Sequence, residues 1–179
     1  AAVTIPQISW GTIDTRYAKH RLPQLKKQQL TTLKGWRGER VNAQAVVWTG
    51  TEVKDLNFSF TDFRDKKGNS LSDEAFKAGF IRYVMTDELN KDGRGACGHR
   101  QAVDYDSLLV ADPIDTNLKS MSVPARTVQP IWVQCWIPQS ATPGTYKGAL
   151  LVKDGSRLLQ QLNLEILVSS RELPAPSEW

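Results

Sequence analysis

Apolar and polar residues alternate along most of this chain with the period of two that is typical of β-strands. The clearest runs are residues 41–48, 56–60 and 80–86, and the last of these is apolar on both faces, which predicts a more central strand. In the first two runs, the side chains predicted to face a core are Val41, Ala43, Ala45, Val47, Leu56, Phe58 and Phe60. Only residues 72–77 look helical, over about one turn. The pattern therefore predicts an all-β protein.

A hairpin is predicted near the C-terminal end. Leu150 and Val152 lead into Asp154-Gly155, which is a strong signal for a short hairpin turn. The returning strand would place a row of aliphatic side chains on its buried face: Leu158, Leu162, Leu164, Ile166 and Val168. Polar residues occupy much of the opposite face. One buried and one solvated face indicate an outer sheet of a sandwich.

A strand, a proline-bounded loop and a returning strand follow one another between residues 131 and 153. Ile131–Ile137 is the first strand, Pro138 and Pro143-Gly144 bound the loop, and Tyr146 stands in the second strand. Proline removes a ladder donor and glycine admits positive φ, so Pro-Gly predicts a turn. This succession is typical of extracytoplasmic β-sandwiches. We expect one antiparallel sandwich over residues 1–172, immunoglobulin-like or jelly-roll in topology, and a proline-containing linker over 173–179 toward a downstream domain.

Two stretches are predicted to be irregular. Residues 87–104 are rich in glycine, asparagine and charge, and residues 111–126 contain Asp112-Pro113, a turn signature. Long loops in compact domains are often functional.

Length and composition set further limits. The 179 residues suit one domain, and 40% hydrophobic with 23% charged residues is ordinary globular composition. No run approaches the roughly 18 apolar residues of a membrane-spanning helix. The chain starts at Ala1 without Met and without a charged leader. We therefore expect a mature, extracytoplasmic protein, periplasmic or at the cell surface, whose signal peptide has been removed.

Positive charge is concentrated at the start of the chain. Residues 1–40 carry eight Lys and Arg against Asp14 and Glu39. Such a segment could contact nucleic acid or an anionic surface, or it could protect the edge of a sheet from pairing with another chain. No recognition helix or ribonucleoprotein motif accompanies it, which favours the edge and argues against a nucleic-acid partner.

Candidate catalytic chemistry is sparse. Asp104, Asp106 and Asp112 offer carboxylates near loops, and glycoside hydrolysis commonly needs a pair of them. No third group accompanies them, so they are interpreted as solvated loop carboxylates. The sequence has no Ser-His-Asp order, no glycine-rich phosphate loop and no histidine pair at helical spacing. It therefore predicts no catalytic residue and no cofactor.

The cysteines leave two interpretations open. Cys97 and Cys135 could form a disulfide, which would stabilise the fold by roughly 4 kcal/mol, or remain two free thiols. With His20 and His99 they could in principle bind zinc, but their spacing matches no compact ligand pattern. No metal site is predicted.

The tryptophans are candidates for an interface or a binding site. Trp132 and Trp136 share one strand face opposite the apolar side chains, and four strand residues span about 13 Å. Three roles remain open for them: core packing, docking of another domain, and stacking of sugars. Trp179 ends the short linker and joins Trp132 or Trp136 as a candidate for a docking patch.

Several motifs resemble one known family. Trp36-Arg37-Gly38-Glu39-Arg40 precedes a strand that contains Gln44, and Ile131-Trp132-Val133, Pro138, Pro143–Gly148 and Leu173-Pro174 follow in order. In this order and spacing they resemble the N-terminal β-sandwich domain of family 123 glycoside hydrolases.

The resemblance implies an all-β domain followed by a (β/α) barrel that acts on terminal β-linked N-acetylgalactosamine by a substrate-assisted mechanism. The catalytic acidic pair of that family lies in the barrel, so no catalytic residue is carried over to this chain. The implied function is a non-catalytic accessory domain of a secreted glycoside hydrolase, with the barrel as its partner in cis. The alternative is a carbohydrate-binding module that stacks glycans on exposed tryptophans.

Overall fold

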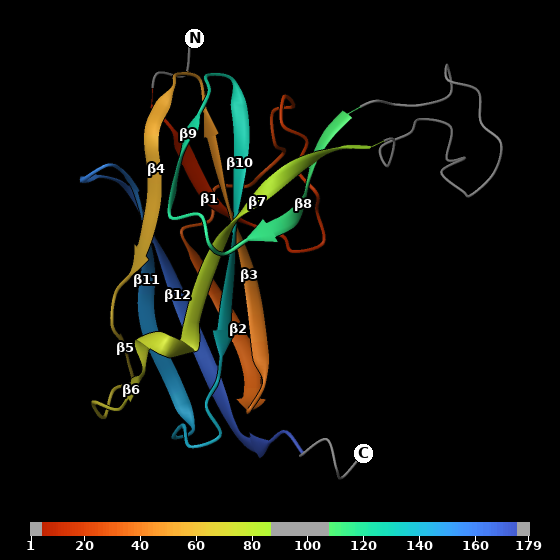
Figure 1. The fold of residues 1–179 in the computed structure, drawn as a ribbon. Coiled ribbons are helices and arrows are strands. Elements are labelled where there is room, and N and C mark those ends of the chain that lie inside the picture. Colours follow the sequence, from red (N-terminus) through yellow and green to blue (C-terminus); the bar gives the residue numbers. More distant parts are fainter. Residues whose placement is uncertain (1–4, 87–107, 175–179) are drawn as a thin grey trace, which may run out of the picture.

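The structure, a computed structural model, describes residues 5–86 and 108–174 as two β-sheets packed face to face (Figure 1). The five-stranded sheet has the order β1 (Gln7–Gly11), β3 (Arg40–Thr49), β10 (Thr127–Trp136), β7 (Phe76–Thr86) and β8 (Leu108–Asp115). The other sheet has the order β2 (Leu30–Arg37), β12 (Arg157–Glu172), β11 (Gly144–Asp154), β4 (Val53–Phe60) and β9 (Ser120–Val123). Short strands β5 (Phe63–Arg64) and β6 (Ser70–Leu71) extend it beside β11. The predicted all-β sandwich is confirmed.

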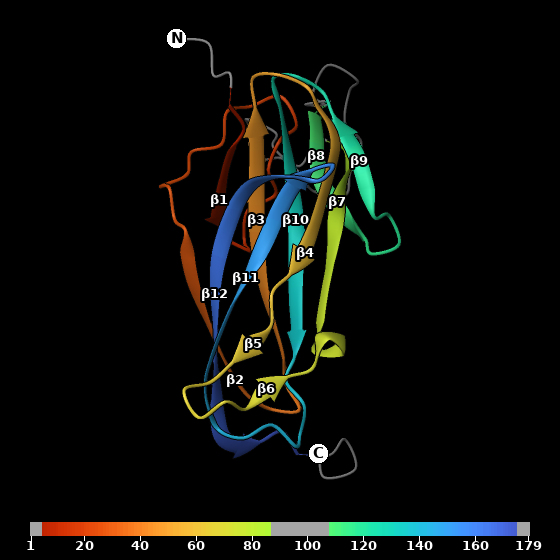
Figure 2. The same cartoon turned by 90° about the vertical axis from the view of Figure 1, so that its left-hand side faces the viewer.

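Strand pairing is antiparallel except at one place. β12 pairs with β2 in parallel, from Asn163 beside Leu30 to Glu172 beside Arg37. A parallel neighbour cannot be reached by a tight hairpin. The chain accordingly crosses between the sheets many times before β12 returns to β2 (Figure 2).

The core lies between the sheets, and the predicted inward faces form it. In β3, Val41, Ala43, Ala45 and Val47 are all buried. In β4, Leu56 is buried, and Phe58 and Phe60 pack against the core from partly buried positions. The predicted helical turn is the 3₁₀ helix η1 (Asp73–Ala75).

The segment Pro143–Gly148 serves the core. Tyr146 is buried, and its hydroxyl donates to the carbonyl of Thr142 at 2.7 Å. A Cβ at Gly148 would lie 2.7 Å from the ring of Phe63, so only glycine leaves room for that ring. Phe63 in turn stacks on Phe76 with ring centroids 4.0 Å apart. The motif therefore positions side chains of the sandwich.

The C-terminal hairpin is confirmed, with one correction. β11 and β12 pair across the turn at Gly155, whose φ of 59° suits glycine. The prediction that Leu158 is buried is wrong, because its exposed fraction is 51%. A β-bulge after Val152 inserts one residue into β12, so that Leu159 packs against the core instead.

Residues 111–126 are more regular than predicted. They include the end of β8 and all of β9. The expected turn at Asp112-Pro113 is wrong, because both residues lie in β8, an edge strand whose register with β7 shifts between Ile81 and Tyr83. Proline is tolerated at an edge strand or a bulge, since its missing N–H removes no ladder bond there. The predicted loop at 87–104 lies outside the described residues.

The basic N-terminal segment lies mostly between strands. β1 and β2 are both edge strands, as the charge pattern suggested. Most of the basic side chains, however, stand in the connection between β1 and β2, where Arg16 forms an ion pair with Asp112 at 3.5 Å. Tyr17 anchors this connection by packing against Val46 and Val128. Protection of a strand edge therefore accounts for few of these charges.

Candidate functional site

Three segments meet where the chain leaves the sandwich, at the lower end in Figures 1 and 2. They are the β2–β3 turn (36–40), the loop after β10 (138–143) and the end of β12 together with Leu173 (171–173), and we call this region the exit end. The amide of Gly38 donates to the carbonyl of Ile137 at 2.8 Å. The amide of Leu173 donates to the carbonyl of Arg37 at 2.8 Å. Backbone hydrogen bonds therefore fix the three segments to one another.

The motif Trp36-Arg37-Gly38-Glu39-Arg40 builds the β2–β3 turn. Gly38 has a φ of 86°, which few residues other than glycine adopt. A carboxylate oxygen of Glu39 accepts the amide of Trp36 at 2.7 Å and closes the turn.

Arg37 clamps the departing chain. Its guanidinium lies 3.1 Å from the carboxylate of Glu172 and donates to the carbonyls of Gln139 and Ser170 at 3.2 and 3.5 Å. One side chain thus contacts both neighbouring segments of the exit end. These contacts hold the end of β12 beside the loop after β10.

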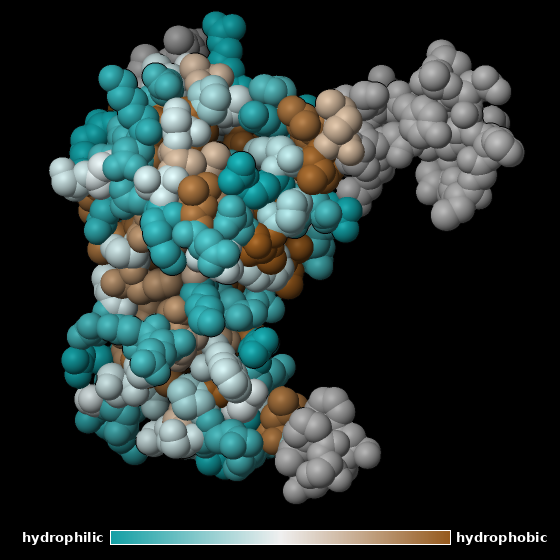
Figure 3. Space-filling model, in the orientation of Figure 1, coloured by the Kyte–Doolittle hydropathy of each residue, from teal (hydrophilic) through white to brown (hydrophobic). Residues whose placement is uncertain are grey.

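A groove of about 640 Å³ lies beside the clamp, between β2 and β12. The register of the two strands shifts here, so that residues 169–171 of β12 lie opposite the single residue Trp36. We call it the exit groove, and it is lined by Lys34, Gly35, Trp36, Glu39, Leu167, Val168, Ser169 and Leu173. Trp36 and Leu167 are 38% and 36% exposed there. Apolar surface is visible beside the end of the described chain (Figure 3).

Trp136 stands on the predicted strand face and reaches the exit end. It is 54% exposed, whereas its neighbour Cys135 is fully buried. The indole nitrogen donates to the carbonyl of Gly38 at 3.2 Å, and the guanidinium of Arg40 lies 4.8 Å from the ring centroid. The ring lines a second cavity of about 440 Å³, the Trp136 pocket, together with Gly38, Ser72, Glu74, Ala75, Pro138 and Gln139.

Trp132 lies on the same outer face but away from the exit end. It is half-buried beside Gln134, whose amide donates to Asn42 at 3.3 Å. Trp179 lies outside the described residues. Of Trp132 and Trp136, the structure brings only Trp136 to the exit end, and the interface roles of all three tryptophans stay predictions.

The candidate carboxylates form no described site. Asp104 and Asp106 lie outside the described residues, and Asp112 is on the edge strand β8. Within residues 5–86 and 108–174, no group of three His, Cys, Asp or Glu side chains is placed to hold a metal ion. No helix in this part of the chain is long and apolar enough to cross a membrane.

Cys135 is a buried thiol. Burial raises its pKa to about 12, since the charged thiolate is disfavoured away from water. Within the described residues it has no disulfide partner. Cys97 and His99 lie outside those residues, so the bridge between Cys97 and Cys135 stays a prediction.

Sequence reasoning missed most of the lining of both cavities. Leu167 carried a signal, because it is apolar on a strand face whose earlier members are Gln161, Asn163 and Glu165. The polar residues of the Trp136 pocket carried none, since they come from separate segments that only the fold brings together.

The chain is similar to one family along most of its length. The model of the glycoside hydrolase 123 N-terminal domain matches residues 10–154. None of the curated proteins matches the chain.

Among solved structures, a family 123 glycoside hydrolase from Clostridium perfringens, described in connection with glycolipid glycan hydrolysis, superposes with a TM-score of 0.76 at 21% identity. The match covers 97% of this chain and 29% of that one. The N-terminal domain of PorA has a TM-score of 0.41 at 10% identity, covering 93% of this chain and 98% of that one. A PapD-like domain of human CEP192 has a TM-score of 0.40 at 11% identity, covering 87% and 96%.

Proposed function

This chain belongs to the family of glycoside hydrolase 123 N-terminal domains, and we propose that it is a non-catalytic accessory domain that packs against a downstream catalytic (β/α) barrel. The observation that carries the proposal is the exit end, where the departing chain is clamped beside an apolar groove.

The length of the solved relative supports a further domain. This chain spans 29% of the Clostridium perfringens enzyme, so most of that enzyme lies outside the matched region. A domain that follows Leu173 would begin next to the exit groove, because the amide of Leu173 is bonded to Arg37. A short tether from a fixed point forces neighbouring surfaces together.

The exit groove has the character of a packing surface. Trp36, Leu167 and Leu173 give it an apolar lining, and aromatic residues are enriched at interface anchors. Covering such surface removes it from water and stabilises the contact by about 25 cal/mol per Å² before association costs. We therefore place the contact with the barrel here.

Two leucines of β12 provide a matched test. Leu167 lines the exit groove, and Leu158 is comparably exposed near the hairpin tip at the other end of the strand. In a protein that contains this domain and the barrel, Leu167→Lys should raise hydrogen exchange along β2 and the end of β12. Leu158→Lys should leave that exchange unchanged. Equal exchange in both variants, with the sandwich folded, would refute docking at the groove.

Catalysis is proposed to reside in the barrel. The 179-residue chain should not hydrolyse an aryl N-acetyl-β-galactosaminide above a buffer blank. Turnover that Asp104→Ala or Asp106→Ala abolishes would overturn this assignment. The extracytoplasmic location belongs to the same proposal, and fractionation of cells that express the whole protein tests it.

A further inference from the structure

Trp136 is exposed and yet held in place. Its indole nitrogen is bonded to the carbonyl of Gly38, and Arg40 packs over the ring. More than half of the side chain nevertheless remains accessible to solvent. Such a fixed aromatic surface can take a flat apolar ligand face with little loss of side-chain entropy.

Polar groups surround the ring. Ser72 and Glu74 come from the start of η1, and Gln139 comes from the loop after β10. Within the part of the chain that the structure describes, none of these three side chains has a hydrogen-bond partner. They supply a hydroxyl, a carboxylate and an amide, which together can donate and accept hydrogen bonds. The pocket thus combines one aromatic wall with several available polar groups.

We propose that the Trp136 pocket binds the ring of a neutral pyranose. The C–H face of a pyranose is apolar and would stack on the indole, while its hydroxyls would bond to Ser72, Glu74 and Gln139. A volume of about 440 Å³ lies within the range of roughly 300–1,000 Å³ that is usual for small-molecule sites. In such sites, a small number of polar groups around an apolar wall fixes the orientation of the ligand.

The charge of the lining selects among sugars. Glu74 is the only charged side chain among the residues that line the pocket. A carboxylate accepts hydrogen bonds from sugar hydroxyls but repels another carboxylate. We therefore expect neutral sugars such as galactose or N-acetylgalactosamine to bind more tightly than a uronic acid whose carboxylate faces Glu74.

The pocket is separate from the docking surface. It shares no lining residue with the exit groove, so a sugar could occupy it while a barrel covers the groove. A sugar held here would lie at the same end of the molecule as the chain exit. Failure of sugar binding would leave docking untouched, and failure of docking would leave the sugar site untouched.

The test is a titration of the isotope-labelled 179-residue chain followed by amide and indole resonances in NMR. The probes are galactose, N-acetylgalactosamine, glucose and galacturonic acid. We expect saturable shifts of the Trp136 indole and of the amides of Ser72, Glu74 and Gln139 with a neutral sugar. For a ligand of this size the Kd should be on the order of 1 mM. Galacturonic acid should bind more weakly than galactose.

Two tryptophan variants distinguish binding in the Trp136 pocket from unspecific binding to any exposed indole. Trp136→Ala should weaken binding by about tenfold. Trp36→Ala, which removes an exposed indole from the exit groove, should leave the Kd unchanged. If Trp136→Ala does not fold, the double variant Ser72→Ala with Gln139→Ala replaces it and should weaken binding several-fold. Shifts that do not saturate with any neutral sugar, or equal loss in the Trp36 variant, would overturn the proposal.

Discussion

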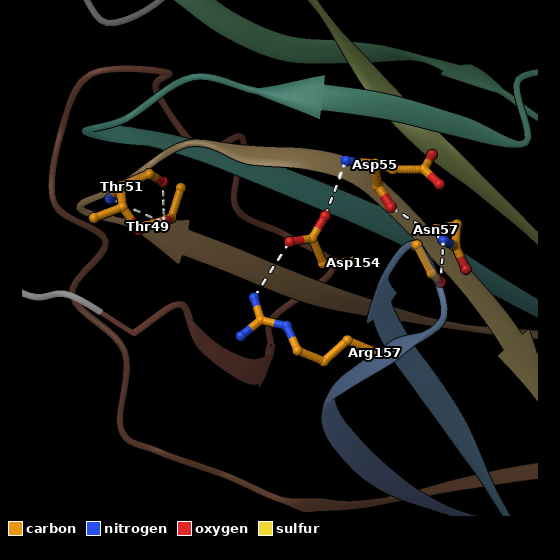
Figure 4. Close-up of polar contacts among 7 residues, drawn as sticks. Thr49, Thr51, Asp55, Asn57, Asp154 and Arg157 are labelled. Atoms are coloured by element: carbon orange, nitrogen blue, oxygen red, sulfur yellow. Dashed lines mark hydrogen bonds and ion pairs between the residues drawn. The ribbon is translucent and has the colours of Figure 1, made fainter.

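The tip of the β11–β12 hairpin and the exit end are both places where strands turn, but they differ in how far their polar side chains are bonded within the protein. At the tip, the carboxylate of Asp154 accepts the amide of Asp55 at 3.0 Å and lies 3.2 Å from the guanidinium of Arg157 (Figure 4). The amide of Asn57 donates to the carbonyls of Asp55 and Gly155 at 3.0 and 2.9 Å. The side chains of Asn57, Asp154 and Arg157 are thus bonded within the fold.

At the exit end, the backbone is equally well bonded but several side chains are not. Arg37 and Glu39 complete the turn, while Ser72, Glu74 and Gln139 are left without partners among the described residues and Trp136 is exposed. Polar groups that close on one another stabilise a fold, and polar groups left open beside an aromatic ring are available to a ligand. This contrast is the reason why the proposed ligand site is placed at the exit end and not at the tip.

The largest effect on stability should come from the tip. Asn57→Ala leaves the carbonyls of Asp55 and Gly155 without this donor, and we expect a loss of about 1–2 kcal/mol in the free energy of unfolding. Chemical denaturation measures it. The control is Asn163→Ala, which removes an exposed side chain that accepts only from Gln161 and should change stability by less than about 0.5 kcal/mol.

A smaller loss is expected at the clamp. Arg37→Ala removes the ion pair with Glu172 and both carbonyl contacts, but the pair is partly exposed, so the expected cost is about 1 kcal/mol. Hydrogen exchange at Leu173 should rise more than exchange elsewhere. Arg64→Ala removes a more exposed pair with Asp62 and serves as the control, with no measurable loss expected. If both variants behave alike, Arg37 does not act as a clamp.

The open side chains of the Trp136 pocket should contribute almost nothing to folding. Ser72→Ala, Glu74→Gln and Gln139→Ala are each expected to change the free energy of unfolding by less than about 0.5 kcal/mol. Thermal melts of the three variants check this. A loss comparable to that of Asn57→Ala would show that the pocket is structural, and the contrast between the two ends would fail.

The turn between β5 and β6 provides a third region for the comparison, in which the stabilisation by a bonded polar side chain should depend on pH. Asp65 accepts the side-chain amide of Asn69 at 2.7 Å and the backbone amides of Lys67 and Asn69, each at 2.8 Å. The bond from the Asn69 side chain is the main cause that lowers the pKa of Asp65 below its ordinary value.

Because the folded pKa is below the unfolded one, this stabilisation is present above the unfolded pKa and is lost as pH falls through the folded pKa. The difference in melting temperature between wild type and Asp65→Asn should therefore be largest near neutral pH and shrink in acid. A difference that does not vary with pH would exclude this contribution of the charged carboxylate.

Periodicity predicted the fold well where strands are regular. The alternation around Val41–Val47 and Leu162–Val168 gave the correct buried faces, because burial between two sheets enforces a period of two. It failed at Leu158, since one inserted residue at a bulge reverses the faces beyond it and leaves little trace in the sequence. The turn predicted at Pro113 was wrong because proline is compatible with an edge strand, where its missing N–H removes no hydrogen bond of the sheet.

The candidate site was predictable only in part. The parity of Trp136 against Val133 and Cys135 correctly placed it on an outer face. Its pocket required knowledge that η1 and the loop after β10 approach the same turn. Such long-range contacts are set by topology, and no local pattern around Ser72 or Gln139 encodes them.

The parallel pairing of β12 with β2 has a consequence for the order of assembly during synthesis. Arg37 and Ser170, which it brings into contact, are 133 residues apart in sequence. During synthesis, at about 5–20 residues per second, β2 therefore has no β12 to pair with until nearly the whole domain has been translated. The contacts of Arg37 with β12 and the exit groove therefore form only in that last step. The surface proposed to receive a following domain is completed only when nearly all of β12 has been translated.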